Sequence, residues 1–269
     1  MVPVGLFVVS VIAFMFVALS SSESWLSMII MFALMCSACV ASVVGFAFSA
    51  IAGASLYHLV STPVEVVKIL LWSSIAIQLY SVIQLWQYIK WRRLIPYLAG
   101  GFVTVGPFCW LVLHMSAGAY LLAIGLFIAA YGVYRLFSSP KAVQVSKRTG
   151  LFIDVATGAM GGITGPFAAF PGAAIAIWCC MRGWDKVEQR SVFQPYILIM
   201  QVVTLGIFTM MGGSSSLNFS YALFAVPAVF GCHIGLLLFK RLSNSQFNRL
   251  VSCFLIISGI SMIAKMLGR

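Results

Sequence analysis

Acidic residues are scarce in this chain. Its 269 residues include five Asp and Glu against 16 Lys and Arg, and only 8% of all residues are charged. A soluble domain carries about 25% charged residues, so this composition excludes an ordinary water-soluble fold. The apolar segments contain no acidic cluster of the kind that many cation-coupled sites need. Transport of an anion fits this shortage better than transport of a cation.

Several catalytic and structural signatures are absent as well. The sequence contains no Walker lysine motif, no HExxH and no GxSxG. Its seven cysteines lie in or beside apolar segments, which argues against a disulfide framework or a zinc site. Cys36 and Cys39 form one C-x-x-C, for which we expect a packing role. The sequence therefore predicts no enzyme, no cofactor and no bound metal.

Apolar residues dominate what is present. They make up 62% of the chain, and a bilayer core about 30 Å thick needs about 20 of them for each helical crossing. The chain is predicted to be an all-α, polytopic integral membrane protein. The amino terminus lacks the basic stretch and cleavage site of a secretory peptide, so we expect a retained helix there. Apolar segments occur at 3–20, 25–60, 64–89, 94–113, 116–137, 150–181, 186–211, 218–240 and 247–267.

Most of the basic residues lie in four clusters at or near the ends of these segments, and the other loops have almost none; Lys68, Lys265 and Arg269 lie outside the clusters. Cytoplasmic loops of membrane proteins are enriched in Lys and Arg, so topology accounts for most of the net charge of +11 without nucleic acid as a partner. We expect the bacterial inner (cytoplasmic) membrane as the location. The four clusters lie within residues 90–93, 135–148, 182–190 and 240–249.

Two apolar segments are too long for one crossing and contain helix breakers. Segment 25–60 contains Gly45, Ser49 and Gly53, and segment 150–181 contains five glycines and two prolines between 158 and 172. Each is predicted to be a broken or re-entrant helix, because glycine and proline both disfavour a continuous helix.

Both broken segments lead into similar sequences, which indicates a duplication. The cap patterns are Thr62-Pro63-Val64-Glu65 and Asp185-Lys186-Val187-Glu188, and a glutamine follows each cap residue after sixteen positions, at Gln78 and Gln201. We divide the chain into an extra helix (1–24), a first repeat (25–137), a basic cytoplasmic linker (138–149) and a second repeat (150–269). All basic clusters are cytoplasmic only if the broken segments enter from opposite sides, which makes the repeats inverted. Full crossings would make them parallel.

The breaks are the first candidate site. Non-helical backbone at membrane depth is tolerated where it lines a cavity, and the free amides at a helix start attract anions. Thr164-Gly165-Pro166 and Phe170-Pro171-Gly172 both resemble such starts, with Gly45, Ser49 and Gly53 as the first-half counterpart. The alternative is that the glycines only allow close helix packing.

Midplane polar residues are the second candidate site. Gln194 lies roughly 13 Å along its helix from Asp185, and Ser73 and Ser74 lie roughly 17 Å from Thr62. Gln194 precedes Pro195, so it either contacts a ligand or repairs a kink. Arg190, one turn earlier, either attracts an anion or extends to the membrane surface.

Three further polar residues are assigned structural roles. For Gln78 and Gln201 we expect hydrogen bonds between helices. Asp154 is placed near a helix start, where a carboxylate complements the helix dipole.

Motifs in both halves of the chain match a known family signature. The second-half motifs are Gly161-Gly162-Ile163-Thr164-Gly165-Pro166-Phe167, Phe170-Pro171-Gly172, Met181-Arg182-Gly183-Trp184-Asp185-Lys186 and Arg190-Ser191-Val192-Phe193-Gln194-Pro195, and the first half has the fainter matches Gly45-Phe46-Ala47-Phe48 and Thr62-Pro63-Val64-Glu65. Through these motifs, nearly the whole chain beyond residue 24 resembles the sulfite exporter TauE/SafE family. The resemblance implies a bacterial inner-membrane permease that exports sulfite, sulfoacetate or a related organosulfur anion.

The resulting hypothesis is a secondary exporter of a small anion that works by alternating access between the repeats. Its partners are the anionic substrate and the lipid bilayer, with a coupling proton or sodium ion and a homodimer left open. Two alternatives remain: a passive anion channel, and a membrane subunit or assembly factor that transports nothing.

Overall fold

The computed structural model describes residues 24–46, 48–59, 63–114, 143–168, 171–212 and 223–267, together with residues 126, 129, 130 and 133. Every regular element within these ranges is a helix, as predicted. Four of the described helices are long and apolar enough to cross a membrane, with spans at 25–44, 69–88, 91–111 and 186–211. The predicted helix over 1–24 and the segment 116–137 lie almost wholly outside the described residues.

The helix boundaries confirm both predicted breaks. In segment 25–60 one helix ends at Val44 and the next begins at Phe48, and in segment 150–181 one helix ends at Ala168 and the next begins at Ala173. Pro63 is the first residue of its helix, where its missing N–H costs no hydrogen bond. The helices are α2 (Ser24–Val44), α3 (Phe48–Leu59), α4 (Pro63–Leu85), the short 3-10 helix η1 (Trp86–Tyr88), α5 (Trp91–His114), α7 (Lys147–Ala168), α8 (Ala173–Met181), α9 (Lys186–Gly212), α10 (Ala225–Arg241) and α11 (Asn244–Leu267).

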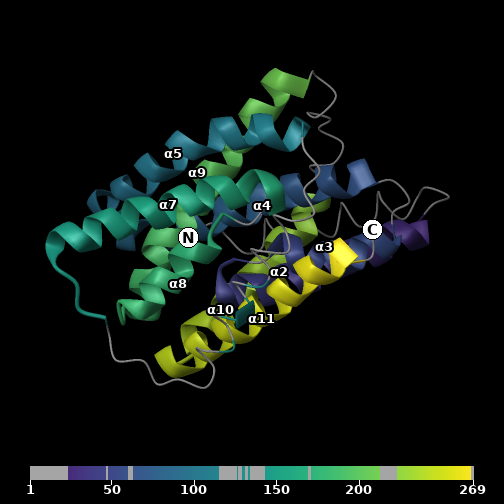
Figure 1. Ribbon diagram of the computed structural model, residues 1–269. Helices are drawn as coiled ribbons and strands as arrows, with labels where there is room; N and C mark the ends of the chain where they lie inside the picture. Colours follow the sequence, from purple (N-terminus) through teal and green to yellow (C-terminus); the bar gives the residue numbers. More distant parts are fainter. Residues whose placement is uncertain are drawn as a thin grey trace.

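The helices of the two halves interleave (Figure 1). Helix α5 of the first half packs along α7 of the second, and α10 of the second half packs along α2 of the first. We call α2, α3, α4, α10 and α11 the α2 lobe, and α5, α7, α8 and α9 the α5 lobe. The lobes meet mainly where α4 contacts α9.

Each lobe has its own hydrophobic cluster. The α2 lobe buries aliphatic side chains such as Leu34 and Leu56. The cluster of the α5 lobe is centred on α8 and α9, and it also includes Phe46 from the first break and Phe239 from α10. These two aromatic residues therefore connect the lobes close to the first break.

Glycine residues lie at the closest helix contacts. Close packing was the alternative role predicted for the glycines at the breaks, and it applies to some of them. A Cβ atom at Gly158 of α7 would fall on the carbonyl group of Tyr97 in α5, and one at Gly162 would fall on Thr104. At Gly231 of α10 it would meet the backbone carbonyl of Met35 in α2. Small residues at such positions let membrane helices approach closely.

Helices α4 and α9 run antiparallel to each other. Gln201 bonds to Ser74, whereas Gln194, earlier in α9, bonds to Gln78, later in α4. Beyond the end of α4, Arg93 reaches Glu188 in the first turn of α9. The contact between the lobes is therefore made by two helices that run in opposite directions.

Only one of the two expected interactions of the α9 capping box is described, the one made by Asp185. Asp185 Oδ1 accepts hydrogen bonds from the backbone N–H groups of Val187 and Glu188, both at 2.8 Å. Glu188 does not complete the capping box with its side chain, because its carboxylate pairs with Arg93 and Lys90. This ion-pair cluster joins the start of α9 to the loop between η1 and α5.

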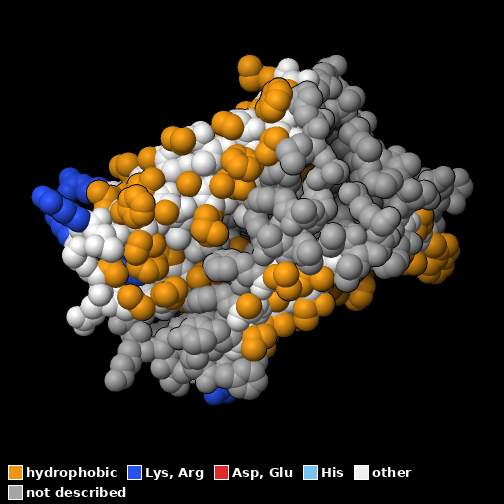
Figure 2. All heavy atoms as spheres, viewed as in Figure 1, with side chains coloured by type: hydrophobic (Ala, Val, Ile, Leu, Met, Phe, Trp, Pro, Cys, Tyr) orange, Lys and Arg blue, Asp and Glu red, His pale blue; other side chains and the backbone are white. Residues whose placement is uncertain are grey.

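The surface matches a protein surrounded by lipid. On the face seen in Figure 2, hydrophobic side chains are spread over the described part of the surface, and the most visible Lys and Arg side chains lie at its left and lower edges. Phe152 and Val103 are both 75% exposed, which is unfavourable in water and favourable in a bilayer.

Candidate functional site

The most buried charge in the described chain is the guanidinium of Arg190, which is 0% exposed. Its Nε and Nη2 donate to Gln194 Oε1 at 3.1 and 2.9 Å, and its Nη1 donates to the backbone carbonyl of Ser42 at 2.9 Å. A residue that extended to the membrane surface would be exposed, so that alternative for Arg190 is wrong. The side chain instead points into the contact between α9 and the end of α2.

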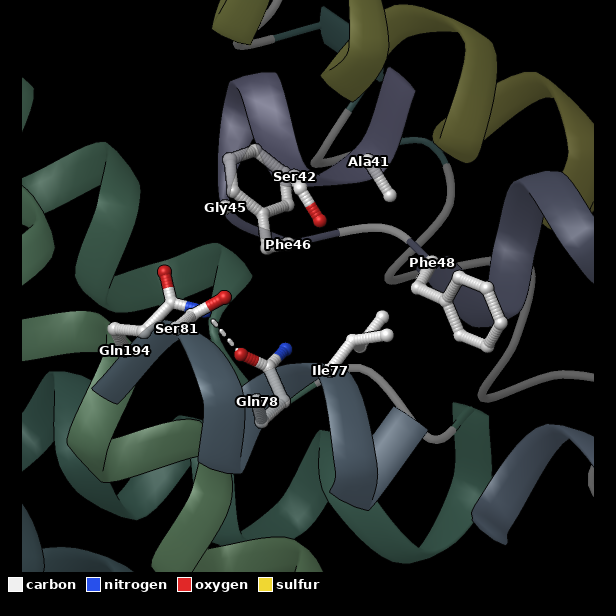
Figure 3. A pocket seen from close by; sticks show the side chains of 9 residues that line it. All are labelled: Ala41, Ser42, Gly45, Phe46, Phe48, Ile77, Gln78, Ser81 and Gln194. Atoms are coloured by element: carbon white, nitrogen blue, oxygen red, sulfur yellow. Dashed lines mark hydrogen bonds between the residues drawn. The ribbon is translucent and has the colours of Figure 1, made fainter. Parts of the chain in front are cut away.

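Gln194 joins Arg190 to the opposite lobe. Its Nε2 donates to Gln78 Oε1 of α4, as the dashed line in Figure 3 marks. The amide therefore bonds to side chains on two helices, and its bonds do not run to the carbonyl freed by Pro195. This arrangement favours a role in the site over repair of the kink.

A small cavity lies beside this pair. Its polar lining comes from Ser42, Gln78, Ser81 and Gln194, and the rings of Phe46 and Phe48 contribute to its apolar wall (Figure 3). The cavity volume is about 10 Å³, room for about one water molecule. An anion of four or more heavy atoms does not fit, so the site is closed in this conformation.

The first break shapes the site through Gly45. This residue has a φ of +94°, which side chains rarely adopt. A Cβ atom there would also lie 2.7 Å from the Phe193 ring and 3.1 Å from Arg190 Nε. Gly45 thus ends α2 and lets its last carbonyl groups reach the guanidinium, which the negative end of the helix dipole stabilises.

The second break meets the first across Phe46. Gly172 caps α8 and packs against Ile197 of α9, and a Cβ atom there would lie 3.6 Å from Phe46 Cβ. The Phe46 ring in turn packs edge-on against Phe193, with centroids 6.0 Å apart. The two breaks, far apart in the sequence, therefore converge on one stretch of α9. Phe170 lies outside the described residues.

One predicted helix start is wrong. Thr164-Gly165-Pro166 lies inside α7, which continues to Ala168. Thr164 is buried and donates to the carbonyl of Gly161 in its own helix at 3.3 Å, and Gly165 packs against Pro171. The break follows Pro166 by several residues, so the free amides of α8 begin after Gly172 and not at Gly165.

Four other predicted residues do not line the cavity. Ser73 and Ser74 are buried on α4, and Ser74 accepts a hydrogen bond from Gln201 at 2.8 Å, which confirms the interhelical role of Gln201. Ser73 Oγ and Gln201 Oε1 have no partner among the described residues. On α3, Gly53 is buried and Ser49 half-buried.

Three contributors to the site were missed at the sequence level. Ser42 acts through its backbone carbonyl, which leaves no signal in residue type. Phe239 of α10 stacks on Arg190, with the guanidinium carbon 4.4 Å from the ring centroid. Gln78 had a signal, its equivalence to Gln201, and it forms the expected interhelical bond while also lining the cavity.

A second polar cluster surrounds Asp154 and holds the α7–α8 hairpin together. Its carboxylate accepts from Tyr97 Oη and Trp178 Nε1, both at 2.6 Å, and pairs with Arg182 at 3.3 Å. The expected dipole role is wrong, because α7 begins at Lys147 and Asp154 lies two turns inside it. Asp154 instead ties α5 and both arms of the hairpin together.

Metal and disulfide chemistry have no counterpart in the part of the chain that is described. No group of three or more His, Cys, Asp or Glu residues there is arranged to hold a metal ion. None of the seven cysteines, all within the described ranges, forms a disulfide.

Comparisons with known proteins identify one family. The model of the sulfite exporter TauE/SafE family matches residues 29–262, which includes both breaks and the whole of α4 and α9. No curated protein matches, and no solved structure matches.

Proposed function

The chain belongs to the sulfite exporter TauE/SafE family, and we propose that it is a secondary transporter that binds sulfite or a related organosulfur anion at Arg190. Members of this family are membrane transporters of sulfur-containing anions, which agrees with the apolar helices of this chain. The substrate, the exporting direction and the mechanism are our inferences from the site.

The burial of Arg190, which has no acidic partner among the side chains that the structure describes, carries the proposal. The three carboxylates with described side chains are engaged elsewhere: Asp154 with Arg182, Asp185 at the α9 cap, and Glu188 with Arg93. A charge inside the membrane is expensive unless it is compensated. Among the described side chains, only neutral acceptors and a helix end compensate the guanidinium, so an anion is the ligand that its charge favours.

The neighbouring groups suit such an anion. A guanidinium offers two parallel N–H groups to a pair of anionic oxygens, and such charge-assisted bonds are stronger than bonds to a neutral amide. An incoming anion can therefore replace Gln194 Oε1 on Arg190. The amide groups of Gln194 and Gln78 then remain as hydrogen-bond donors. Phe48, the first residue of α3, also lines the cavity, so the start of a helix lies beside the site.

The small volume of the cavity supports a mechanism of alternating access. Because the closed cavity holds about one water molecule, substrate entry requires α4 and α9 to separate. We propose that the α2 and α5 lobes move about this crossing, and that the repeats are inverted. The antiparallel course of α4 and α9 supports an inverted arrangement, in which one repeat faces each side of the membrane.

We further propose a location in the bacterial inner membrane, with the basic end of the bundle in the cytoplasm. The positive-inside rule supports this orientation, because Lys90, Arg93 and Lys186 cluster where α5 and α9 begin. Export then proceeds from this end, driven by a proton or sodium gradient.

Flux of radiolabelled sulfite into inside-out proteoliposomes tests the proposal. We expect uptake that depends on an imposed gradient and that is lost in Arg190→Met. Gradient-independent currents would identify a passive channel instead. No flux of any sulfur-containing anion by folded wild-type protein would favour the non-transporting subunit and reject the proposal.

A further inference from the structure

A second, larger cavity lies at the basic end of the bundle. Its volume is about 260 Å³, and it lies between the ends of α4 and η1, the start of α9 and the carboxyl-terminal half of α10. Lys186, Lys240, His233 and the amides of Gln84 and Gln87 contribute its polar groups, and none of the residues described as lining it is acidic. The cavity is therefore suited to an anion.

Phe239 separates this cavity from the buried site. The residue lines the cavity, and its ring stacks on Arg190, with the guanidinium carbon 4.4 Å from the centroid. Lys186 Nζ lies 4.9 Å from the same centroid and donates to the Phe239 carbonyl at 2.9 Å. Phe247 packs edge-on against the ring, with centroids 5.6 Å apart. The Phe239 side chain thus lies between the cavity and the buried guanidinium and contacts both.

We propose that this cavity is a vestibule in which the substrate anion first binds, and that Phe239 is the gate between it and Arg190. The inference rests on the proposed function and adds a second binding site and a gating residue to it. The ring attracts Arg190 through its π-face, and an oxyanion forms a stronger, charge-assisted contact with the same guanidinium. An anion in the vestibule therefore competes with the ring for Arg190 and favours its displacement.

Lys240 is the vestibule cation most available to the anion. Lys186 Nζ already donates to the carbonyl groups of Phe239, Lys240 and Leu242, which end α10. Lys240 is exposed and has no ion-pair partner among the described residues. An anionic lipid headgroup has the same chemistry as a free anion, but the direct contact of Phe239 with Arg190 favours the free substrate.

Replacement of the gate is the first test. In proteoliposomes, Phe239→Ala should abolish uphill sulfite accumulation and raise passive sulfite leak by about tenfold, because a lost aromatic contact worth roughly 1–2 kcal/mol shifts an opening equilibrium by that order. Phe247→Ala, which removes the neighbouring ring and leaves the contact with Arg190, should retain accumulation. Phe239→Leu keeps most of the side-chain volume without the π-face and should also raise the leak. This variant tests the gate if Phe239→Ala does not fold.

Coupled accumulation at the wild-type level in folded Phe239→Ala or Phe239→Leu would overturn the gate. If wild-type protein transports sulfite and these variants behave like it, only the gate fails. If wild-type protein moves no sulfur-containing anion, the proposed function fails and this inference fails with it.

Replacement of the vestibule cation is the second test. Lys240→Gln should raise KM for sulfite roughly threefold to fivefold with kcat unchanged, as expected for one solvated charge. Arg241→Gln removes the adjacent charge, which does not line the cavity, and should leave KM unchanged. Equal increases in KM in both variants would show that general surface charge, and not binding in the vestibule, attracts the anion, and would overturn the proposed vestibule. An effect of Lys240→Gln only in vesicles containing phosphatidylglycerol would assign the cavity to a lipid headgroup and also overturn it.

Discussion

Helices α4 and α9, which the predicted duplication pairs with each other, differ sharply in chemistry. They begin at Pro63 and Lys186, an offset of 123 residues, and each has a glutamine at the same later position. By the same offset, Arg190 and Gln194 of α9 correspond to Val67 and Leu71 of α4. The predicted duplication thus relates the two helices position by position, and Arg190 of the second half is the cation of the proposed site.

The difference in charge between α4 and α9 agrees with the residues that each half contributes to the site. The second half contributes the charge on a continuous helix, while the first contributes the end of a broken one, where the Ser42 carbonyl accepts from Arg190. A pair of buried cations facing each other would repel strongly at this depth. A cation at Arg190, with the apolar Val67 at the corresponding position of α4, avoids this repulsion.

The largest predicted effect comes from removing the asymmetry. Arg190→Met should reduce sulfite transport at least 100-fold, since a lost charge-assisted contact with the anion costs about 3 kcal/mol. Thermal stability in detergent should stay the same or rise, because replacement of a buried charge by an apolar residue is often neutral or stabilising. A cation that served only the fold would show the opposite pattern, with lower stability and transport retained in the folded fraction.

The two glutamines of α9 sharpen the comparison next. Gln194→Leu leaves Arg190 and Gln78 without their shared partner, so we expect about a tenfold loss in kcat/KM. Gln201→Leu removes a single bond to Ser74 away from the cavity, and its kcat/KM should stay within about twofold of wild type. Comparable losses in both variants would mean that interhelical bonding, and not the site, sets the rate.

Glycine at the first break gives a third, smaller effect. Gly45→Ala should lower the free energy of unfolding by about 1–3 kcal/mol, because a side chain at positive φ is strained and would press on Phe193. Gly206→Ala is the matched control within α9, where a Cβ atom meets nothing within 4 Å. Thermal unfolding in detergent checks both, and equal melting temperatures for the two variants would contradict the account of Gly45.

Asp154 gives the smallest of the four effects. Asp154→Asn retains an acceptor for Tyr97 and Trp178 while it removes the charge that pairs with Arg182, so we expect a loss of about 1 kcal/mol in unfolding free energy. KM for sulfite should not change, because Asp154 does not line either cavity. A raised KM with normal stability would extend the site to the α7–α8 hairpin.

Features encoded by neighbouring residues were predictable from the sequence. The break at Gly45, the cap at Asp185, the helix start at Pro63 and the Gln201 interhelical bond follow from local composition and periodicity. Continuation of α7 through Pro166 did not follow, because a proline in a membrane helix is tolerated when packing compensates for the lost hydrogen bond.

Features that depend on distant contacts were not predictable. Arg190 lies only about 7 Å along α9 from Asp185, so depth along the helix alone favoured the membrane surface. Its burial comes from the end of α2 and from Phe239, which are far away in the sequence. The interleaving of α5 and α10 between the halves likewise cannot be derived from a count of apolar segments.

Equilibrium binding of radiolabelled sulfite to purified protein tests the central claim most directly. The account predicts a high-affinity saturable site in wild-type protein that is lost in folded Arg190→Met, which retains only the weaker binding of the vestibule. Binding that is equal in the two proteins would show that the buried guanidinium of α9 is not the anion site, and would contradict the account.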